Sequence, residues 1–395
     1  MNLVIFWSIY CVLRKKVVTL LPKRWLYSHH ITYFLENMRY LTLEKALHAW
    51  QQIQPLTEDQ NNKLSRRFTI DFNFNSNHIE GNTLTYGQTE ILLLFGKIIG
   101  EADVKDVHDM TASNVALKMM SEETLIKETP LTQNFIRTLH RTLLREDYKV
   151  YRTLPGGVQT SYTIHAGQYK TRPNSVITRY GDRFEYASPE ETPALMTDLV
   201  DWYNKAEQEG KLSPVDLAAL FHYRYIRIHP FEDGNGRIAR LLVNYILARH
   251  GYPMIVVRSR NKSEYLNALH AADLNVGITP NAGAQASLEK IKPFLLYFRN
   301  LVAHEIYTNV LFLTERNEKL WWYDGQQIVF RSINYTHIIK LMMTEPVLTL
   351  DEIQKRLGIN MSAIKKLINQ LLDKHYIERG TTDGSWRVFI TPSID

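Results

Sequence analysis

The sequence predicts a mainly α-helical protein with one β-hairpin flap and a C-terminal winged helix-turn-helix module. Amphipathic patterns with helical spacing dominate the 395-residue chain. A polar, glycine-containing stretch, residues 155–190, interrupts them and favours a hairpin. The segment 349–379 is typical of a helix, a tight turn and a second helix. Because the chain is longer than one hydrophobic core usually supports, we expect a main domain with smaller ones attached.

The composition predicts a soluble globular protein. Hydrophobic residues make up 45% of the chain and charged residues 22%. The net charge of +6 is compatible with a nucleotide, a nucleic acid or an acidic protein as ligand and does not select among them. A single cysteine, Cys11, excludes a disulfide framework and a cysteine-rich metal site. It fits a reducing compartment, so we expect a cytoplasmic protein.

The N-terminal segment, residues 1–30, is an apolar extension. Its residues 3–13 are apolar and are followed directly by Arg14, Lys15 and Lys16. The run is shorter than the ~20 residues that a membrane span needs, and its charges follow rather than precede it. Two interpretations remain, a packed or poorly ordered extension and a membrane-associating segment.

Residues 31–110 form a predicted N-terminal helical region. Ser76 and Glu80 are four residues apart and therefore share one helical face. Gly81 can end that helix in a left-handed conformation, and the capping box at Thr85–Gln88 begins the next helix. Taken alone, this pattern also fits a surface glutamate that precedes a turn.

Two further helices flank a short loop. Ser213 is a predicted N-cap before Pro214, and the helix that follows should end at His229, because the residue before a proline is disfavoured in a helix. A second helix is predicted from Arg237 to His250, ahead of Gly251. The glycine-rich residues between them therefore form a loop between two helices.

The loop combines groups that suit phosphate chemistry. Gly234, Asn235 and Gly236 let the backbone turn its N–H groups inward, and the N-terminus of the next helix adds unpaired N–H groups. Arg237 and Arg240 supply planar donors for phosphate oxygens. Asp233 is a hard oxygen ligand suited to Mg²⁺. His229 has an ordinary pKa near neutrality, which makes it the candidate general base.

The string HPFEDGNGRIAR, His229–Arg240, resembles the Fic family pattern HxFx(D/E)GNGRxxR at every defined position. The resemblance implies an all-helical Fic catalytic domain, placed at residues 111–305, and a protein adenylyltransferase. In that family the histidine, here His229, takes a proton from a Ser, Thr or Tyr hydroxyl of a target protein. The hydroxyl then attacks the α-phosphorus of ATP and expels pyrophosphate.

The same resemblance assigns the other residues of the motif. Asp233 is implied to hold Mg²⁺, and Gly234, Asn235 and Gly236 to hold the phosphates. Arg237 is expected to contact the phosphate chain and Arg240 the γ-phosphate. The related kinase-like Doc branch carries lysine at the position of Gly236. The resemblance therefore favours AMP transfer over phosphorylation.

Two flanking segments extend the resemblance. Residues 167–177 resemble the flap of the family, a hairpin that aligns the target segment by backbone pairing. Ser175, Val176 and Ile177 are expected to contact ATP there, and Lys170 replaces the usual arginine.

The segment NKSEYLNALHAAD resembles the lining of the family's adenine pocket, which makes Tyr265 a candidate to pack on the nucleoside. Family members often carry a second tyrosine and an asparagine where this chain has Leu266 and Asp273. The packing of Tyr265 in the core is the alternative.

Ser76, Glu80 and Gly81 match the inhibitory pattern (S/T)xxxE(G/N) of the family. A glutamate delivered to Arg240 would pair with it by charge-assisted hydrogen bonds and take the place of the γ-phosphate. ATP would then bind in a non-productive pose. The resemblance therefore implies an adenylyltransferase that Glu80 restrains.

The predicted C-terminal module, residues 335–395, resembles a winged helix-turn-helix, a common companion of Fic domains. Thr349 and Glu352 form a capping box at the start of its first motif helix. DNA binding would use four polar residues, Lys365, Lys366, Asn369 and Lys374. Acidic and basic residues nearly balance in the module, however, which favours protein contact or homodimerisation over DNA.

Two other functions remain open from the sequence. The chain could be a regulator that senses a nucleotide and binds DNA through its C-terminal module. It could instead be a phosphodiesterase that removes AMP from a modified protein, with Glu80 positioning a water molecule. The partner of the enzyme is expected to be a protein with an accessible hydroxyl, including the chain itself.

Overall fold

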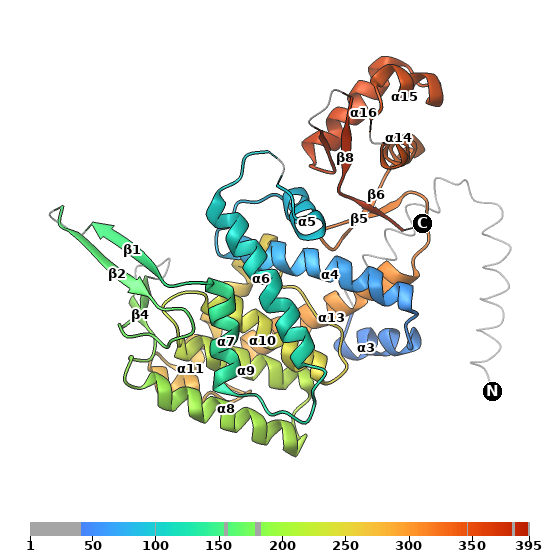
Figure 1. Cartoon of the computed structure of the whole chain (residues 1–395). Coiled ribbons are helices and arrows are strands. Elements are labelled where there is room, and N and C mark those ends of the chain that lie inside the picture. The colour runs from blue at the N-terminus through green and yellow to red at the C-terminus, as the bar shows by residue number, and fades with distance from the viewer. Residues whose placement is uncertain are drawn as a thin grey trace, which may run out of the picture.

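The computed structural model describes residues 41–98, 100–153, 157–177, 183–345, 347–380 and 384–393. The predicted apolar extension, residues 1–30, lies outside these described residues, as does the start of the predicted N-terminal helical region. Within the described ranges, no helix combines the length and apolarity needed to cross a membrane. Helices dominate and the strands are few and short, so the predicted mainly α class is confirmed (Figure 1).

The helical body consists of eleven described α-helices and one 3₁₀ turn. They are α3 (Leu43–Gln52), α4 (Glu58–Ile79), α5 (Tyr86–Phe95), α6 (Val104–Glu123), α7 (Gln133–Leu144), α8 (Thr192–Glu209), α9 (Pro214–Ile228), α10 (Asn235–Arg249), η1 (Ser259–Asn261), α11 (Lys262–Val276), α12 (Pro280–Ala284) and α13 (Lys292–Thr314). The predicted boundaries at residues 110 and 305 fall inside α6 and α13, so neither marks a break between elements.

The core of the body surrounds the antiparallel pair α9 and α10. Helix α9 packs against α8, α12 and α13, and α10 packs against α4, α6 and α7. Aromatic side chains of α9 and α10, among them Phe221, Tyr225 and Tyr245, are fully buried. The loop between these two helices is therefore held from several sides by the densest part of the molecule.

The helix ends at this loop follow from local sequence. The Ser213 hydroxyl accepts the N–H of Asp216, and Pro214 stands in the first turn, which confirms the predicted start of α9. The second helix begins at Asn235, two residues before the predicted start. Gly234 takes φ +75° as its N-cap, so the helical turn starts as soon as this glycine has turned the chain.

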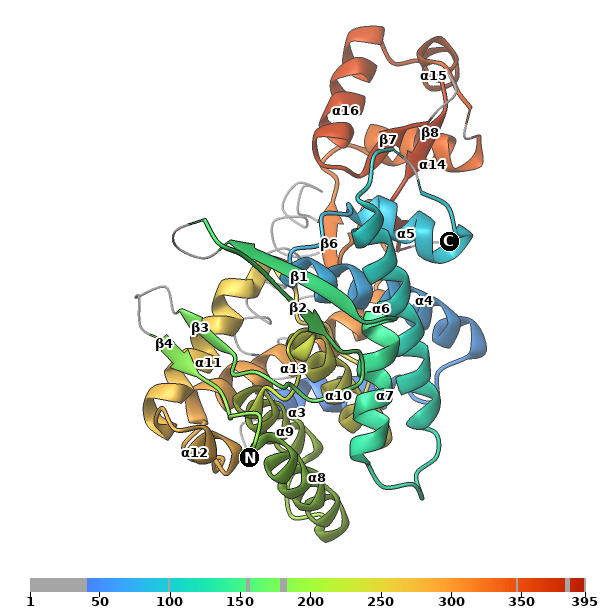
Figure 2. The ribbon, with the colours of Figure 1, turned by 60° about the vertical axis from the view of Figure 1, so that its left-hand side comes forward.

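The predicted interruption at residues 155–190 contains parts of two hairpins. Strand β2 (Gln159–Ile164) pairs antiparallel with β1 (Tyr148–Thr153), which lies before the predicted interruption. Strand β3 (Ser175–Ile177) ends the segment 167–177 that resembles the flap, and it pairs with β4 (Arg183–Glu185) beyond that segment. The β1–β2 hairpin projects from the helical body (Figures 1 and 2). The flap is thus the second hairpin.

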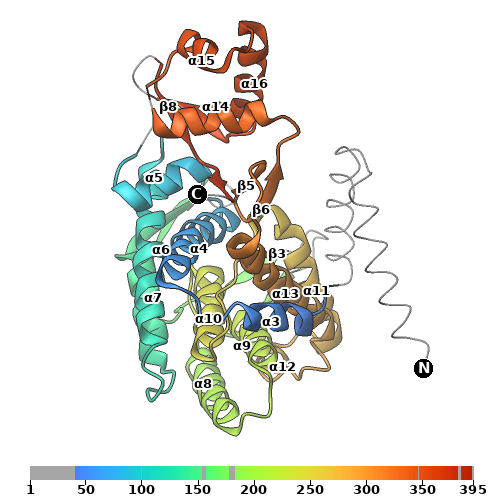
Figure 3. The same ribbon diagram turned by 90° about the vertical axis from the view of Figure 1, so that its right-hand side faces the viewer.

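The C-terminal part begins with a three-stranded sheet in the order β6-β5-β9. Its elements are β5 (Leu320–Tyr323), β6 (Gln326–Val329), α14 (Ile333–Thr344), α15 (Leu350–Leu357), α16 (Met361–Asp373), β7 (Ile377–Arg379), β8 (Trp386–Val388) and β9 (Thr391–Pro392). Three helices followed by the β7–β8 hairpin is the order that a winged helix-turn-helix requires, and the predicted capping box of Thr349 and Glu352 is present. The module has its own hydrophobic core and stands beyond α4 and α5 (Figure 3).

The segment between α13 and α14 is a structured connection. Strands β5 and β6 form a hairpin whose turn is Asp324-Gly325, both with positive φ. An Asp-Gly pair between apolar runs is a strong hairpin pattern, so the β5–β6 hairpin could have been predicted from the sequence. The sheet starts before residue 335 and joins the helical body to the C-terminal module.

Candidate active site

His229 lies at the C-terminal end of α9 with φ +52° and ψ +62°, in the left-handed region. Its Nδ1 is 2.8 Å from the Asn174 amide nitrogen and 3.1 Å from that of Asn235. The ring of Tyr186 stacks on the imidazole at a centroid distance of 4.0 Å. Burial, reinforced by the nearby Lys170 ammonium, lowers the pKa of His229 to about 3. The imidazole is therefore neutral at physiological pH.

Asp233 is fixed at the start of the glycine loop. Its Oδ1 accepts the N–H of Gly234 at 2.7 Å, and its Oδ2 accepts the hydroxyl of Tyr148 at 2.6 Å. Burial favours the neutral carboxyl, but the Arg237 guanidinium and these two hydrogen bonds outweigh it and hold the pKa of Asp233 below its usual value. Asp233 is therefore an ionised carboxylate with a defined orientation.

The start of α10 leaves room for a close ligand only because residue 236 is glycine. A Cβ built on Gly236 would collide with Oε1 of Glu80 and come within 3.1 Å of the Arg240 guanidinium. The first N–H groups of α10 stand at this point, together with the positive end of its helix dipole. The backbone here suits an anion such as a phosphate.

The structure brings Ser76 and Glu80 to Arg240. Arg240 donates from Nε to the Ser76 hydroxyl at 3.0 Å and from one terminal nitrogen to the Ser76 carbonyl at 2.8 Å and Glu80 Oε1 at 2.7 Å. The Arg240 side chain is 3% exposed, whereas that of Glu80 is 40% exposed. Glu80 stands at the end of α4, and Gly81 follows with φ +99°.

A cavity of about 620 Å³ connects these groups. Its lining includes Glu80, His229, Gly236 and Arg240 together with residues of β4 and α11. The rest of the lining includes Phe184, Tyr186, Tyr265, Leu266, Leu269, His270 and Asp273. The volume and the combination of charged and aromatic lining suit a nucleotide, with its phosphates toward the start of α10.

Tyr265 and Asp273 are both tied to neighbours within this cavity. Tyr265 is buried and its hydroxyl lies 2.9 Å from Nε2 of His222. Asp273 accepts the hydroxyl of Tyr223 at 2.7 Å and a guanidinium N–H of Arg227 at 3.1 Å. Arg227 also lies over the Phe184 ring of the flap strand β4. The part of the cavity lining that includes Tyr265 and Asp273 is therefore held in place by several contacts.

The flap contacts His229 through Lys170 and Asn174, which precede β3. Lys170 Nζ donates to the carbonyls of His229 and Ile228 and to the Asn174 side-chain oxygen. In β3, Ser175 pairs with Glu185, and the backbones of Val176 and Ile177 continue the ladder. The side chains of Val176 and Ile177 lie outside the described structure.

Sequence reasoning missed His140, whose ring stacks on Phe231 at 3.7 Å. Its Nδ1 accepts the N–H of Gly167 at 2.9 Å, so its Nε2 carries the hydrogen and donates to the Asp233 carbonyl at 3.0 Å. Burial lowers the pKa of His140 to about 4, consistent with a neutral ring.

Tyr148, Asn174 and Tyr186 were missed as well. Each comes from a segment distant in sequence from the motif. Asn174 lies within residues 167–177, the segment that resembles the flap, whereas no local pattern identifies Tyr148 or Tyr186.

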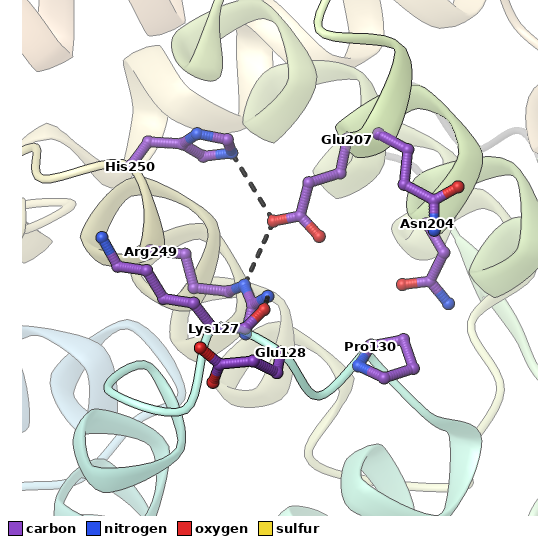
Figure 4. A pocket seen from close by; sticks show the side chains of 8 residues that line it. Lys127, Glu128, Pro130, Asn204, Glu207, Arg249 and His250 are labelled. Carbon is purple, nitrogen blue, oxygen red and sulfur yellow. Dashed lines mark hydrogen bonds and ion pairs between the residues drawn. The ribbon is translucent and has the colours of Figure 1, made fainter.

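A second cavity, of about 360 Å³, lies at the opposite end of α10 (Figure 4). Arg249 there donates to Glu207 and to the carbonyls of Ile126 and Lys127. His250 lies 3.6 Å from the same Glu207 carboxylate. These contacts join the ends of α8 and α10 to the loop after α6, so the cluster is explained as a structural contact.

Metal binding would depend on the nucleotide. No group of three or more His, Cys, Asp or Glu side chains in the described part of the chain is arranged to hold a metal ion. A magnesium ion carried by phosphates needs only one or two protein carboxylates. The ionised and oriented Asp233 beside the anion-binding backbone fits that requirement.

Comparison with known proteins gives consistent matches over the body of the chain. Residues 130–247 match the model of the Fic/DOC family. A solved Fic domain-containing signaling protein from Bacteroides thetaiotaomicron is 51% identical, with a TM-score of 0.63 over 68% of this chain and 95% of that one. Fic-1 from Caenorhabditis elegans has a TM-score of 0.53 at 24% identity, over 77% of each chain, which shows the fold alone.

Curated relatives are named protein adenylyltransferases. The protein adenylyltransferase fic-1 of Caenorhabditis elegans is 32% identical over 197 residues, which is 50% of this chain and 35% of the relative. The protein adenylyltransferase Fic of Drosophila willistoni is 32% identical over 200 residues, 51% of this chain and 36% of the relative. The chain thus matches about a third of the length of these relatives.

Proposed function

Because the chain belongs to the Fic family, we propose that it is a protein adenylyltransferase that moves AMP from ATP to a protein hydroxyl and that Glu80 restrains it. The observation that carries the proposal is the cavity whose lining combines His229, Gly236 and Arg240 with aromatic side chains such as Tyr186 and Tyr265. The names of the curated relatives support ATP as the substrate.

In the proposed reaction the phosphates of ATP lie against the N-terminus of α10 and Arg237. Asp233 would hold Mg²⁺, which would supply positive charge beside the phosphates and the leaving pyrophosphate. The oxygen of the target hydroxyl forms a bond to the α-phosphorus while the bond to pyrophosphate breaks, and the hydroxyl proton passes to His229. Since the imidazole is neutral, it is able to accept that proton in the tautomer that carries its hydrogen at Nδ1.

The proposed brake follows from competition for Arg240. Three of its hydrogen bonds go to Ser76 and Glu80, so the guanidinium is engaged before a γ-phosphate arrives. The Glu80 carboxylate also repels the like charge of a phosphate in that position. The wild-type chain is therefore proposed to bind ATP mostly in a pose that does not align the α-phosphorus.

The test is auto-AMPylation of the purified full chain with ATP and Mg²⁺, read by intact-protein mass spectrometry. Glu80→Gly is expected to accumulate an AMP adduct, and the double variant with His229→Ala is expected to show none. Glu90→Gly serves as a matched control, because Glu90 lies on α5 and pairs with Arg66 rather than Arg240. Absence of an adduct from Glu80→Gly would contradict both the activity and the brake.

A second candidate, removal of AMP from a modified protein, is favoured by the placement of Glu80. Its carboxylate is partly exposed and lines the same cavity as His229. A carboxylate there is able to accept a proton from a water molecule that attacks the α-phosphorus. Incubating the auto-AMPylated Glu80→Gly chain with wild-type chain and Mg²⁺ tests this, with release of free AMP as the expected result.

The partner class in both reactions is a protein with an accessible hydroxyl. The four residues considered for DNA contact, Lys365, Lys366, Asn369 and Lys374, are exposed on and just after α16. A gel-shift assay with genomic fragments separates the regulator hypothesis from the enzyme. Sedimentation of the full chain tests homodimerisation.

A further inference from the structure

Two side-chain amides converge on the same nitrogen of His229. Asn174 places its Nδ2 at 2.8 Å from His229 Nδ1, and Asn235 places its Nδ2 at 3.1 Å from that atom. Asn235 belongs to the loop motif, whereas Asn174 comes from the segment before the flap strand β3. Each amide is able to present either an N–H or an oxygen to the ring. That choice determines which ring nitrogen carries the hydrogen.

The orientation of the Asn235 amide is fixed by the backbone of Phe231. Asn235 Oδ1 accepts the Phe231 N–H at 3.0 Å, and Nδ2 donates to the Phe231 carbonyl at 2.7 Å. Turning the amide over would place oxygen against oxygen and nitrogen against nitrogen. Asn235 therefore presents an N–H to His229.

The orientation of the Asn174 amide is fixed by Lys170. Asn174 Oδ1 accepts from Lys170 Nζ at 2.8 Å, and Nδ2 also donates to the Phe231 carbonyl at 3.0 Å. Lys170 Nζ makes two further bonds, to the carbonyl of His229 at 2.9 Å and that of Ile228 at 3.1 Å. Lys170 is 3% exposed, and all three of its ammonium hydrogens have acceptors. Burial lowers the pKa of Lys170 to about 7, and turning the amide over would place its N–H group against Nζ and remove one of the three acceptors of this buried nitrogen.

Nδ1 of His229 thus faces two N–H donors and acts as an acceptor. A neutral imidazole that accepts at one nitrogen carries its hydrogen at the other, here Nε2. An Nε2–H group can donate a proton but cannot accept one at that atom. The base that AMP transfer needs is the other tautomer, with its hydrogen at Nδ1 and a free lone pair at Nε2.

We propose that Asn174, oriented by Lys170, is a positioning residue that selects the Nε2-protonated tautomer of His229 and so biases the site toward removing AMP rather than attaching it. This inference rests on the proposed function, because it concerns the direction of that chemistry. It assigns a role to the flap beyond holding a target segment.

The proton balance of the two reactions explains the bias. In removal, water forms a bond to the α-phosphorus and gives a proton to Glu80, while the bond from phosphorus to the protein oxygen breaks. That leaving oxygen takes the hydrogen from His229 Nε2, which leaves an imidazolate whose Nδ1 accepts from Asn174 and Asn235. The proton held by Glu80 then returns to Nε2 and restores the neutral ring. In attachment, the protein hydroxyl gives its proton to Nε2. Nε2 must therefore carry no hydrogen before the reaction. The structure supplies the form of His229 that removal uses.

Asn174→Asp is the sharpest test because it keeps the shape and replaces the donor by an acceptor. A carboxylate at this position would accept a hydrogen from Nδ1 and keep the contact with Lys170. In serine proteases the opposite change, carboxylate to amide beside the catalytic imidazole, leaves the geometry intact and lowers kcat about 10⁴-fold through the wrong tautomer. We expect Asn174→Asp to raise AMP attachment in the Glu80→Gly background at least about fivefold.

The same substitution is expected to lower AMP removal in the Glu80 background by a similar factor. Removal is measured as AMP release from purified auto-AMPylated Glu80→Gly chain, which serves as the substrate. Asn300→Asp, on the exposed face of α13, is the matched control for the added charge. A purely structural role for Asn174 would move both reactions in the same direction, and that result would overturn the inference.

A spectroscopic measurement decides the inference without any turnover. The ¹⁵N chemical shifts of histidine-labelled full chain distinguish Nδ1–H from Nε2–H, and comparison with His229→Gln assigns the signal. We expect Nε2–H in the native chain and Nδ1–H in Asn174→Asp. Finding Nδ1–H in the native chain contradicts the inference, whereas a missing AMP adduct from Glu80→Gly contradicts only the proposed function.

Discussion

At the scale of single residues, Arg240 is bound by two different partners, the polar Ser76 and the acidic Glu80. Its Nε and one terminal nitrogen are taken by Ser76 and Glu80, which lie one helical turn apart on α4. Ser76 uses both its hydroxyl and its carbonyl. The serine therefore holds the guanidinium from the side, while the glutamate neutralises its charge.

Ser76→Ala is expected to release the proposed brake in part. The variant loses one hydrogen bond to a charged group and keeps the carbonyl contact and Glu80, a loss of about 1–2 kcal/mol. Auto-AMPylation measured by mass spectrometry should lie between that of the wild type and Glu80→Gly. Ser121→Ala is the control, because the Ser121 hydroxyl bonds only within α6. Activity equal to that of the wild type would show that the hydroxyl does not contribute.

The pH dependence of the reaction should reflect the lowered pKa of His229. An ordinary histidine, with a pKa near 6.5, would be about 90% protonated at pH 5.5 and lose roughly tenfold as a base. Because the pKa of His229 is lowered to about 3, its neutral form persists well below pH 6.5. We expect kcat of Glu80→Gly at saturating Mg²⁺ and ATP to change by less than about threefold between pH 7.5 and 5.5. A tenfold loss centred near pH 6.5 would contradict this.

At the scale of elements, three segments meet at the loop between α9 and α10. His140 of α7 bonds the Gly167 N–H before the flap and the Asp233 carbonyl in the loop. Its ring also fills the space against Phe231. One buried side chain thus positions the metal-binding candidate relative to the flap.

His140→Phe is expected to lower the free energy of unfolding by about 2–4 kcal/mol. The substituted ring keeps the stacking area but leaves the Gly167 N–H and the Asp233 carbonyl without their partner. Urea titration of the full chain measures the effect. His48→Phe, on the exposed part of α3, should change stability by less than about 0.5 kcal/mol. Equal stability of the two variants would show that water replaces the lost bonds.

The helices and strands differ in how well their boundaries could be predicted from local sequence. The ends of α9 and the capping box at Thr349 follow from local patterns, and the structure confirms them. The β1–β2 hairpin was divided wrongly, because a two-stranded hairpin outside the core has few buried positions to mark its register. The motif itself could be read from one twelve-residue string.

The remaining contacts of the site could not be read from local patterns. His140, Tyr148, Asn174 and Tyr186 come from four segments spread along the chain, and their meeting at the motif depends on tertiary packing. Sequence patterns report periodicity and capping, which act over a few residues. Pairings across tens of residues require the fold.

At the scale of the whole molecule, the β5–β6 turn connects the C-terminal module to α4. Asp324 of that turn accepts the Asn75 amide at 2.6 Å and Arg258 at 3.0 Å. A Cβ on the adjacent Gly325 would collide with the Arg258 guanidinium, so the glycine permits this close approach. Asn75 directly precedes Ser76, the partner of Arg240. The connection to the C-terminal module therefore contacts α4 next to Ser76 and Glu80, the residues of the proposed brake.

Asp324→Ala is expected to weaken the brake through α4. The variant loses the carboxylate bonds to Asn75, Arg258 and Arg260, while Arg258 keeps Asp71 and Glu305. Auto-AMPylation should rise at least about twofold in the otherwise native chain. It should not change in the Glu80→Gly background, where the brake is already absent.

Asp351→Ala, at an exposed position of α15, controls for the lost charge. If Asp324→Ala raises auto-AMPylation equally in the native and Glu80→Gly backgrounds, Asp324 does not act through the proposed brake.

The proposed competition between Glu80 and the γ-phosphate of ATP for Arg240 has a reciprocal thermodynamic consequence. If Glu80 weakens the productive binding of ATP by some factor, ATP must weaken the Glu80–Arg240 contact by the same factor. Because the same helix α4 also binds the β5–β6 turn, this coupling free energy extends to the C-terminal module. Saturating ATP should therefore speed amide hydrogen exchange at residues 75–80 and around Asp324, so that the connection to the module would report the nucleotide level through the helix that carries the proposed brake.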